Sequence, residues 1–506
     1  MRRTKKNIML IFILFCINNL NAQNVLTKKQ MYEDFDQLIE IISDCNPQIP
    51  IRAKVTGFDN LKFAKSLRHN IDTITDGNSY FNLLHYVLRS MYDIHAYIAD
   101  SYHIGVDDLK NIDTNYIVRP LFSAFSIRSF LGNPTYIDGS YYFFNENWII
   151  DYKAKDTIRL KDAKILTYNG KEFSKFVKET QYTFNQLNAR WDYKKKEYYS
   201  VYALVPFSGI LTLENQGKIA TIDLNKSYQI LINYKSTHVE KPNIAVNNYF
   251  ETFKNKVFYF DQDKILYIRL GSMMDDKKEF YDQIKKVGQN NEIKKIIIDV
   301  RNNKGGSDYV WHQTLSAIIK DSILYQPTLA FVNSSNIKKI YNNSDNGVTT
   351  KSFKLKTFDW CPDFQFLVSE FPPSYIVPDS NSLEYDGKIY ILQNKYVYSS
   401  AHALTSFARY CDQLISIGEP TGLLSGLGLM PTLFQLQNSK FTFRLETAID
   451  VTDVKNIEDV YQDIPEIWIE IPIEKQIEWE KDSYYNQQSE EYLFKYDYLF
   501  QQVLKY

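Results

Sequence analysis

Apolar residues recur at every third or fourth position in two stretches near the start of the chain. These are MYEDFDQLIEII, which begins at Met31, and YFNLLHYVLRSMYDIH, which begins at Tyr80. This spacing places the apolar side chains on one face of an α-helix. It therefore predicts a helical N-terminal domain over residues 23–110.

The pattern then changes to short runs with the composition of β-strands. VRPLFSAFSI, TYIDGSYYFF and TIRLKDAKILTYNG occupy much of residues 111–182. Asn169 and Gly170 favour a turn, and the following FSKFV predicts the start of a helix. We interpret this stretch as a small β-rich domain of the PDZ-like kind, although any small β domain could contain such a turn. Residues 183–257 are assigned as a connecting region without a role.

Strands and helices alternate from Lys264 onward. The predicted strands include KILYIRL, KKIIIDV, KIYILQN and LISIGEP, and helical patterns such as FYDQIKKV and SSAHALTSFARY fall between them. This alternation is typical of an α/β domain with a mainly parallel sheet and crossover helices. We expect that domain to cover residues 258–506. Functional sites in such sheets lie at the carboxyl ends of the strands.

Two of those strand ends carry candidate chemistry. The run IIIDV leads into RNNKGG, where Gly305 and Gly306 can present backbone N–H groups, although an ordinary tight turn is the alternative. KIYILQN leads into VYSSAHAL, where Ser399 and Ser400 stand at a helix start. Serine in that place is commonly a cap. In the functional interpretation Ser400 attacks a carbonyl, and the N–H groups of Ala401 and the glycine turn stabilise the oxyanion.

A serine nucleophile needs a base, and the chain has seven histidines. His95 stands out because it follows the long amphipathic helical pattern in MYDIHAYI. His402 is close to Ser400 in sequence, but two residues along a helix point to different faces. His95 is therefore the candidate general base.

Composition narrows the choice of partners. With 506 residues, of which 44% are hydrophobic, the chain can bury the cores of several domains. The 59 Lys and Arg residues nearly balance the 60 Asp and Glu residues, which gives no general attraction for nucleic acid or an anionic membrane. No spacing typical of a metal site is present, and we expect no metal and no cofactor.

The first residues resemble a targeting segment. A basic start at Arg2 and Arg3 precedes an apolar run over residues 8–17 that is too short to span a bilayer comfortably. This predicts a signal peptide over residues 1–22 and a periplasmic or extracellular mature protein, with an uncleaved anchor as the alternative. No later stretch is apolar enough to cross a membrane. The remaining cysteines, Cys45, Cys361 and Cys411, are too irregularly spaced for a disulfide framework.

The order of these segments resembles the tail-specific, or C-terminal processing, serine peptidases of the tricorn-like branch. The resemblance is strongest over residues 264–463, and RNNKGG and SIGEPTG on either side of the Ser-Ala pair are together quite specific. It implies that Ser400 is the nucleophile and His95 the base. The other branch of the family uses a lysine after the GEPT segment, and this chain has no lysine between Lys395 and Lys440.

The sequence departs from the family pattern at several positions. Ile94 and Ala96 replace the usual Gly and Thr beside the histidine, and Ala403 replaces an acidic residue after the nucleophile. The resemblance also implies a late acidic residue that orients the base directly or through another group, for which Glu458 is the candidate and Asp459 the rival.

The expected function is peptide or protein cleavage through a Ser/His acyl-enzyme mechanism. The oxyanion hole would comprise Gly305, Gly306 and Ala401. The alternative is a catalytically inactive protein on the same scaffold that binds peptides or another exported ligand. An esterase is less favoured because the GxSxG pattern is absent around Ser400. The sequence leaves the substrate and the oligomeric state open.

Overall fold

The computed structural model describes most of the chain, with gaps between the described segments. These segments are residues 26–93, 95–98, 134–137, 139–143, 148–151, 156–160, 162–180, 189–192, 194–200, 202–203, 205, 209–224, 229–231, 254–342, 348, 350–421, 428–461, 463–481 and 490–506. The predicted signal peptide and Ile94 lie outside them.

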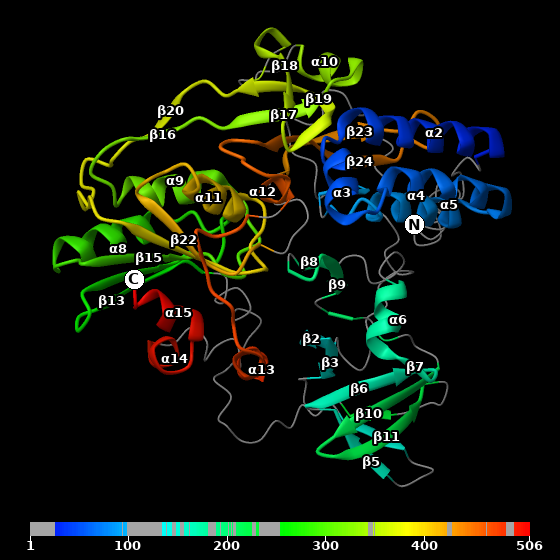
Figure 1. Ribbon diagram of the computed structural model, residues 1–506, viewed down its shortest axis with the longest axis horizontal. Coiled ribbons are helices and arrows are strands. Elements are labelled where there is room, and N and C mark those ends of the chain that lie inside the picture. The colour runs from blue at the N-terminus through cyan, green and yellow to red at the C-terminus, as the bar shows by residue number, and fades with distance from the viewer. Residues whose placement is uncertain are drawn as a thin grey trace, which may run out of the picture.

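A six-stranded sheet forms the centre of the C-terminal half (Figure 1). Five neighbouring strands are parallel and one edge strand is antiparallel, which confirms the predicted mainly parallel sheet. In order across the sheet they are β13 (Lys256–Phe260), β14 (Ile265–Arg269), β15 (Lys295–Asp299), β21 (Ile389–Gln393), β22 (Leu414–Gly418) and β25 (Ile467–Trp468).

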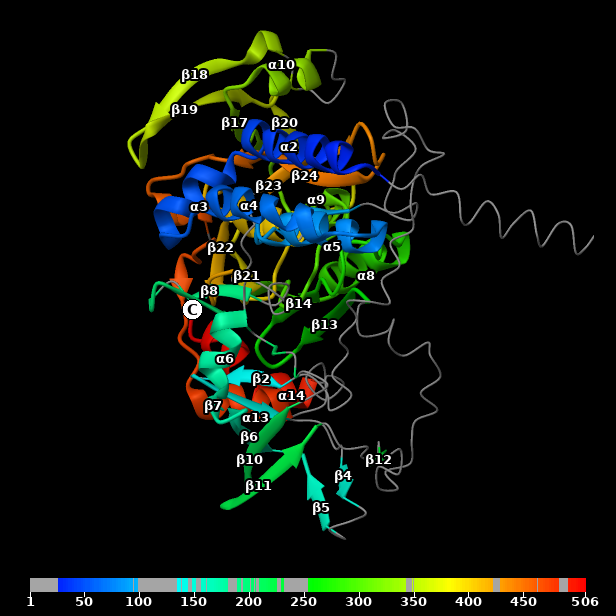
Figure 2. The ribbon, with the colours of Figure 1, turned by 90° about the vertical axis from the view of Figure 1, so that its right-hand side faces the viewer.

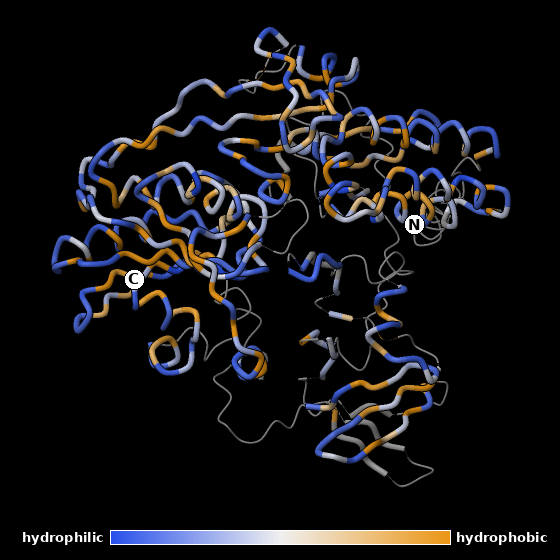
Figure 3. Tube along the Cα trace, in the orientation of Figure 1, coloured by the Kyte–Doolittle hydropathy of each residue, from blue (hydrophilic) through white to orange (hydrophobic). Residues whose placement is uncertain are grey.

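Helices cover both faces of this sheet, as expected for crossover connections. One face packs against α8 (Lys278–Gln289), α9 (Asp308–Ser316) and α11 (Ser400–Ala408). The other packs against α14 (Glu490–Lys495) and α15 (Tyr498–Val503). Every residue of β14 is buried, which explains its unbroken apolar sequence. Figure 3 shows the hydrophobic positions gathered along such strands and on the inner sides of the helices.

A second, antiparallel sheet combines one strand from the N-terminal part of the chain with five strands from the C-terminal half. Its strands are β1 (Tyr97–Ile98), β24 (Thr442–Asp450), β17 (Thr328–Val332), β19 (Cys361–Glu370), β18 (Lys354–Phe358) and β23 (Gly428–Gln435). The N-terminal helices α2 (Lys28–Cys45), α4 (Asn60–Ser66) and α5 (Gly77–Arg89) share one hydrophobic core with it. The predicted helices are therefore present, but their apolar faces are covered by strands from the C-terminal half.

The predicted β-rich domain contains an antiparallel sheet with five strands side by side. This sheet lies apart from the two sheets described above (Figure 2). Its strands are β11 (Lys218–Asp223), β10 (Ile210–Asn215), β6 (Ala163–Tyr168), β3 (Ser140–Phe143) and β2 (Thr135–Ile137). Asn169 and Gly170, with φ of 49° and 78°, make the predicted turn into β7 (Lys171–Glu172) and α6 (Phe173–Thr180). Strands β10 and β11 come from the stretch assigned as a connecting region. The PDZ-like identity of this domain stays a prediction.

Shorter elements complete the described structure. The remaining strands are β4 (Trp148–Asp151), β5 (Asp156–Arg159), β8 (Ala189–Asp192), β9 (Glu197–Ser200), β12 (Gln229–Leu231), β16 (Ile323–Tyr325) and β20 (Ser374–Ile376). The remaining helices are α3 (Gln48–Thr56), η1 (Leu67–Thr73), α10 (Ser335–Tyr341), η6 (Thr350–Ser352), α12 (Ile457–Tyr461) and α13 (Ile473–Lys481). Among the described residues, none of the helices is both long and apolar enough to cross a membrane.

Candidate active site

Ser400 is the first residue of α11 and follows the carboxyl end of β21 through a sharp turn. Ser399, before it, has φ of 55° and ψ of −130°, a conformation that costs a non-glycine residue free energy. The Ser399 side chain makes no capping hydrogen bond. Ser400 is 5% exposed, and its Oγ has no hydrogen-bond partner among the described residues. The structure thus shows neither serine acting as a helix cap.

The glycine turn packs directly against the serine turn. Gly305 has φ of 92°, and a Cβ at this position would lie 2.5 Å from Ser399 Cβ and 2.8 Å from Ser400 N. Only glycine allows this approach without displacing the backbone. RNNKGG is therefore more than an ordinary tight turn, because it is in contact with the residue proposed as the nucleophile.

Not all of the predicted oxyanion donors are available. Gly305 N–H already donates to Asn303 Oδ1 at 2.8 Å, so the prediction for Gly305 needs correction. For Gly306 N–H we find no partner within the described part of the chain. Ala401 N–H belongs to the first turn of α11, where backbone donors lack intrahelical partners. Gly306 and Ala401 therefore remain the candidate donors.

Asparagine side chains hold the two strand-end loops together. Asn394 Oδ1 accepts from Asn302 N–H at 3.1 Å, and Asn394 Nδ2 donates to Asn302 Oδ1 at 3.0 Å. Tyr398 N–H donates to Asn303 O at 3.0 Å. These bonds fix the glycine turn relative to Ser400 before any ligand binds.

A buried ionic network anchors the base of the same loop. Arg301 pairs with Asp299, at the end of β15, and with Asp497, just before α15, each with a contact of 2.7 Å. Burial alone would raise the pKa of Asp299, but Arg269 and Arg301 outweigh it and lower the pKa to about 2. The glycine loop therefore begins at Arg301, whose charge is paired with two buried carboxylates.

His95 reaches the serine turn from the other sheet. It lies between α5 and β1, and β1 pairs with β24 through Tyr97 and Arg444. The His95 ring packs on the ring of Tyr398, two residues before Ser400, with 4.8 Å between centroids. The structure contains no hydrogen bond between His95 and Ser400 Oγ, and such bonds often form only when substrate is bound.

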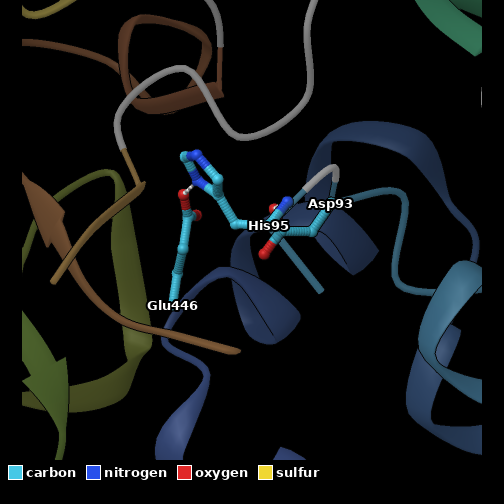
Figure 4. Close-up of side chains that lie close together, drawn as sticks. All are labelled: Asp93, His95 and Glu446. Carbon is cyan, nitrogen blue, oxygen red and sulfur yellow. Dashed lines mark hydrogen bonds and ion pairs between the residues drawn. The ribbon is translucent and has the colours of Figure 1, made fainter. Parts of the chain in front are cut away.

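The carboxylate that contacts His95 is Glu446, on β24 (Figure 4). Glu446 Oε1 bonds His95 Nδ1, and its Oε2 accepts from Gln48 Nε2. Asp93 Oδ1 accepts from His95 N–H at 2.8 Å, which fixes the backbone of the turn. The imidazole is thus oriented through Nδ1, and Nε2 remains for proton transfer.

Both members of this pair have raised pKa values. Burial, followed by repulsion from Asp93, raises the pKa of Glu446 to about 7, against the opposing effect of His95. Burial lowers the pKa of His95, but the attraction and hydrogen bond of Glu446 outweigh burial, so the net shift is upward. The pair therefore stabilises a proton on its shared hydrogen bond.

Glu458, the acidic residue that the resemblance implies, does not bond His95 directly. It lies on α12 and pairs with Lys196 Nζ at 3.0 Å. Asp459 accepts from Asn456 N–H at 3.2 Å in the same helical turn. Neither residue takes the place at His95 Nδ1, because Glu446 already fills it.

Sequence reasoning missed Glu446 because it is 351 residues from His95. The local signal is an acid in the middle of the strand sequence FTFRLETAID, where Glu446 is fully buried and a buried carboxylate needs a partner. Ala96 is also fully buried, in the core beneath the N-terminal helices, and Ala403 packs at the edge of the central core.

His402 and the cysteines have structural environments. His402 is fully buried, and burial lowers its pKa to about 3, so it is not a base poised near neutral pH. All three described cysteines are buried and outside disulfides, and burial raises the pKa of Cys45 to about 12. A thiol nucleophile is therefore not favoured there.

Comparisons with known proteins relate part of the chain to a peptidase family. Residues 264–465 match the family described as peptidase family S41. The chain is similar to that family over this segment, and its overall fold is S41-like.

The similar solved structures have low sequence identity to this chain. Mature CPAF is 13% identical, with a TM-score of 0.54 over 94% of this chain and 98% of that one. Mature CPAF complexed with lactacystin is 12% identical, with a TM-score of 0.50 over 94% and 99%. The photosystem II D1 C-terminal processing protease is 10% identical, with a TM-score of 0.36 over 88% and 94%. No curated protein sequence matches this chain.

Proposed function

We propose that this protein is a serine-type peptidase in which Ser400, His95 and Glu446 act together. The observation that carries the proposal is the placement of His95. A buried carboxylate bonds its Nδ1, and its ring lies against Tyr398 in the turn that presents Ser400. These contacts support the roles of nucleophile, base and orienting group for Ser400, His95 and Glu446.

The chemistry is acyl transfer. His95 Nε2 takes the proton of Ser400 Oγ as that oxygen attacks a peptide carbonyl carbon, and the N–H groups of Gly306 and Ala401 stabilise the oxyanion. The imidazolium then gives its proton to the leaving amine as the C–N bond breaks. Water attacks the acyl-enzyme by the same sequence of proton transfers. Each oxyanion donor contributes roughly 3 kcal/mol to transition-state stabilisation.

The match to a peptidase family and the N-terminal sequence support a substrate class and a location. The match of residues 264–465 to a peptidase family supports a peptide or protein substrate. The basic and apolar start of the chain supports export through a signal peptide over residues 1–22 and action outside the cytoplasm. Analysis of the mature N-terminus from an exporting host tests the cleavage.

The direct test of activity is labelling with a fluorophosphonate, which reacts with activated serines. Mature protein should be labelled at Ser400, as located by mass spectrometry, and Ser400→Ala and His95→Ala should abolish labelling. Ser399→Ala is the matched control, because it changes the neighbouring hydroxyl while leaving Ser400 in place, and it should retain labelling. A folded wild-type protein that is not labelled would favour the inactive, peptide-binding alternative.

A further inference from the structure

Asp93, His95 and Glu446 form a compact group of possible metal ligands (Figure 4). One ligand atom from each side chain lies within 4.8 Å of the other two. Asp93 and Glu446 are 3% and 0% exposed, so both carboxylates are held inside the protein. They come from the turn after α5 and from strand β24, which the pairing of β1 with β24 fixes relative to one another.

The carboxylates of this group offer more hydrogen-bond acceptor oxygens than are needed to orient the His95 ring. Asp93 Oδ1 accepts from His95 N–H, but Asp93 Oδ2 is buried and has no hydrogen-bond partner among the described residues. A buried carboxylate oxygen without a partner is energetically costly. A cation bound at this place would remove that cost.

We propose that Asp93, His95 and Glu446 bind a zinc ion that switches off the proposed serine site. One imidazole nitrogen and two carboxylate oxygens are ligands that zinc accepts, and its usual four-coordinate geometry leaves a position for water. Zinc bonds of about 2.0–2.2 Å place tetrahedral donors roughly 3.4 Å apart, so small side-chain shifts adapt this group. Calcium and magnesium prefer six or more oxygen ligands and should bind poorly.

The inhibition follows from the tautomer of His95. When Glu446 is ionised it can only accept a hydrogen bond, so His95 Nδ1 carries the shared proton and Nε2 keeps a lone pair for the base. Zinc on Nδ1 displaces that proton, and the neutral ring then carries its proton on Nε2. Such a ring has no lone pair with which to accept the proton of Ser400. Zinc and general-base function are therefore mutually exclusive at this histidine.

Two arginines near the group moderate its charge without occupying the ligand positions described above. Arg52 Nη2 donates to Gln48 Oε1, and Gln48 stands between Arg52 and Glu446. Arg444 Nη1 donates to Tyr97 Oη at 3.2 Å. We therefore expect moderate affinity, of a kind suited to reversible inhibition.

Zinc binding can be measured without activity. The Ser400→Ala protein competes with a chromophoric zinc chelator, and zinc should transfer to the protein. Asp93→Asn and Glu446→Gln in that background should each weaken binding by at least about tenfold, since even residues outside the ligand shell change metal affinity by about 10- to 100-fold. His69→Ala removes an exposed histidine outside the group and should leave affinity unchanged. No transfer of zinc, or equal affinity in all variants, overturns the proposal.

The inhibitory half rests on the proposed function and has its own measurement. Zinc should slow fluorophosphonate labelling of wild-type Ser400, and a chelator should restore the rate. Asp93→Asn, compared with its own zinc-free rate, should need at least about tenfold more zinc for the same inhibition. Labelling that zinc does not slow overturns the switch. Absence of labelling without zinc contradicts the peptidase function instead, while the chelator competition still decides whether zinc binds.

Discussion

The two halves of the candidate site are built in different ways. The nucleophile half lies at neighbouring strand ends of the central parallel sheet, where Gly305 touches the Ser399–Ser400 turn. The base half lies on the antiparallel sheet, where His95 meets a carboxylate from the opposite end of the chain. The first half comprises two short motifs, whereas the second exists only once the two sheets have assembled.

The largest effect should come from breaking the base half. Glu446→Gln removes the charge that fixes the His95 tautomer and should lower the labelling rate or peptidase kcat by up to about 10⁴-fold, as for the orienting carboxylate of a serine protease triad. Glu458→Gln is the matched control, because Glu458 pairs with Lys196, and its rate should stay close to wild type. A larger loss in Glu458→Gln than in Glu446→Gln would restore the assignment implied by the sequence.

The nucleophile half should lose reactivity when the contact between Gly305 and the serine turn is disturbed. Gly305→Ala places a Cβ against Ser399 and Ser400 and should lower the labelling rate by about 10²-fold, as expected when the turn that positions the nucleophile shifts by about 1 Å. Gly57→Ala has a similar positive φ, of 70°, but nothing within 4 Å of the added Cβ. Gly57→Ala should therefore strain the backbone in the same way but keep the wild-type labelling rate. Equal labelling rates in Gly57→Ala and Gly305→Ala would contradict a role for the contact between Gly305 and the serine turn.

Loss of the buried ion pair at the base of the glycine loop should destabilise the protein more than loss of an exposed ion pair. Asp497→Asn takes one charged partner from buried Arg301 and should lower the free energy of unfolding by about 3 kcal/mol in urea titrations. Glu491→Gln breaks an exposed pair with Lys495 and should leave the free energy of unfolding close to that of the wild type. Similar losses in the two variants would show that the anchor is not a distinct stabilising element.

The smallest expected effect is a shift in pH dependence. His95 must be neutral to act as a base, and Glu446 raises its pKa above the ordinary value of about 6.5. The labelling rate should therefore rise with pH through that raised pKa. In Glu446→Gln the attraction is lost, burial of His95 dominates, and the midpoint of the residual rate should move to lower pH. A midpoint that is unchanged in Glu446→Gln would show that Glu446 does not raise the pKa of His95.

Local pattern was enough to predict the central sheet, the helices and the Asn169–Gly170 turn. Each depends on a short period of apolar residues or on a turn dipeptide whose geometry the backbone itself favours. The pattern also marked Ser400, Gly305 and His95 as candidates for one site. It did not show that the amphipathic helices would be covered by C-terminal strands, since an apolar face does not specify its partner.

What the sequence by itself determined is the parallel α/β core and the two motifs at its strand ends, because each residue involved acts through its near neighbours. Only the tertiary structure decided that Glu446 bonds His95, that Glu458 pairs with Lys196, and that Gly305 N–H is already occupied. The reason is physical: a carboxylate chooses among partners by distance and burial, and strand pairing between β1 and β24 sets both across 351 residues of chain.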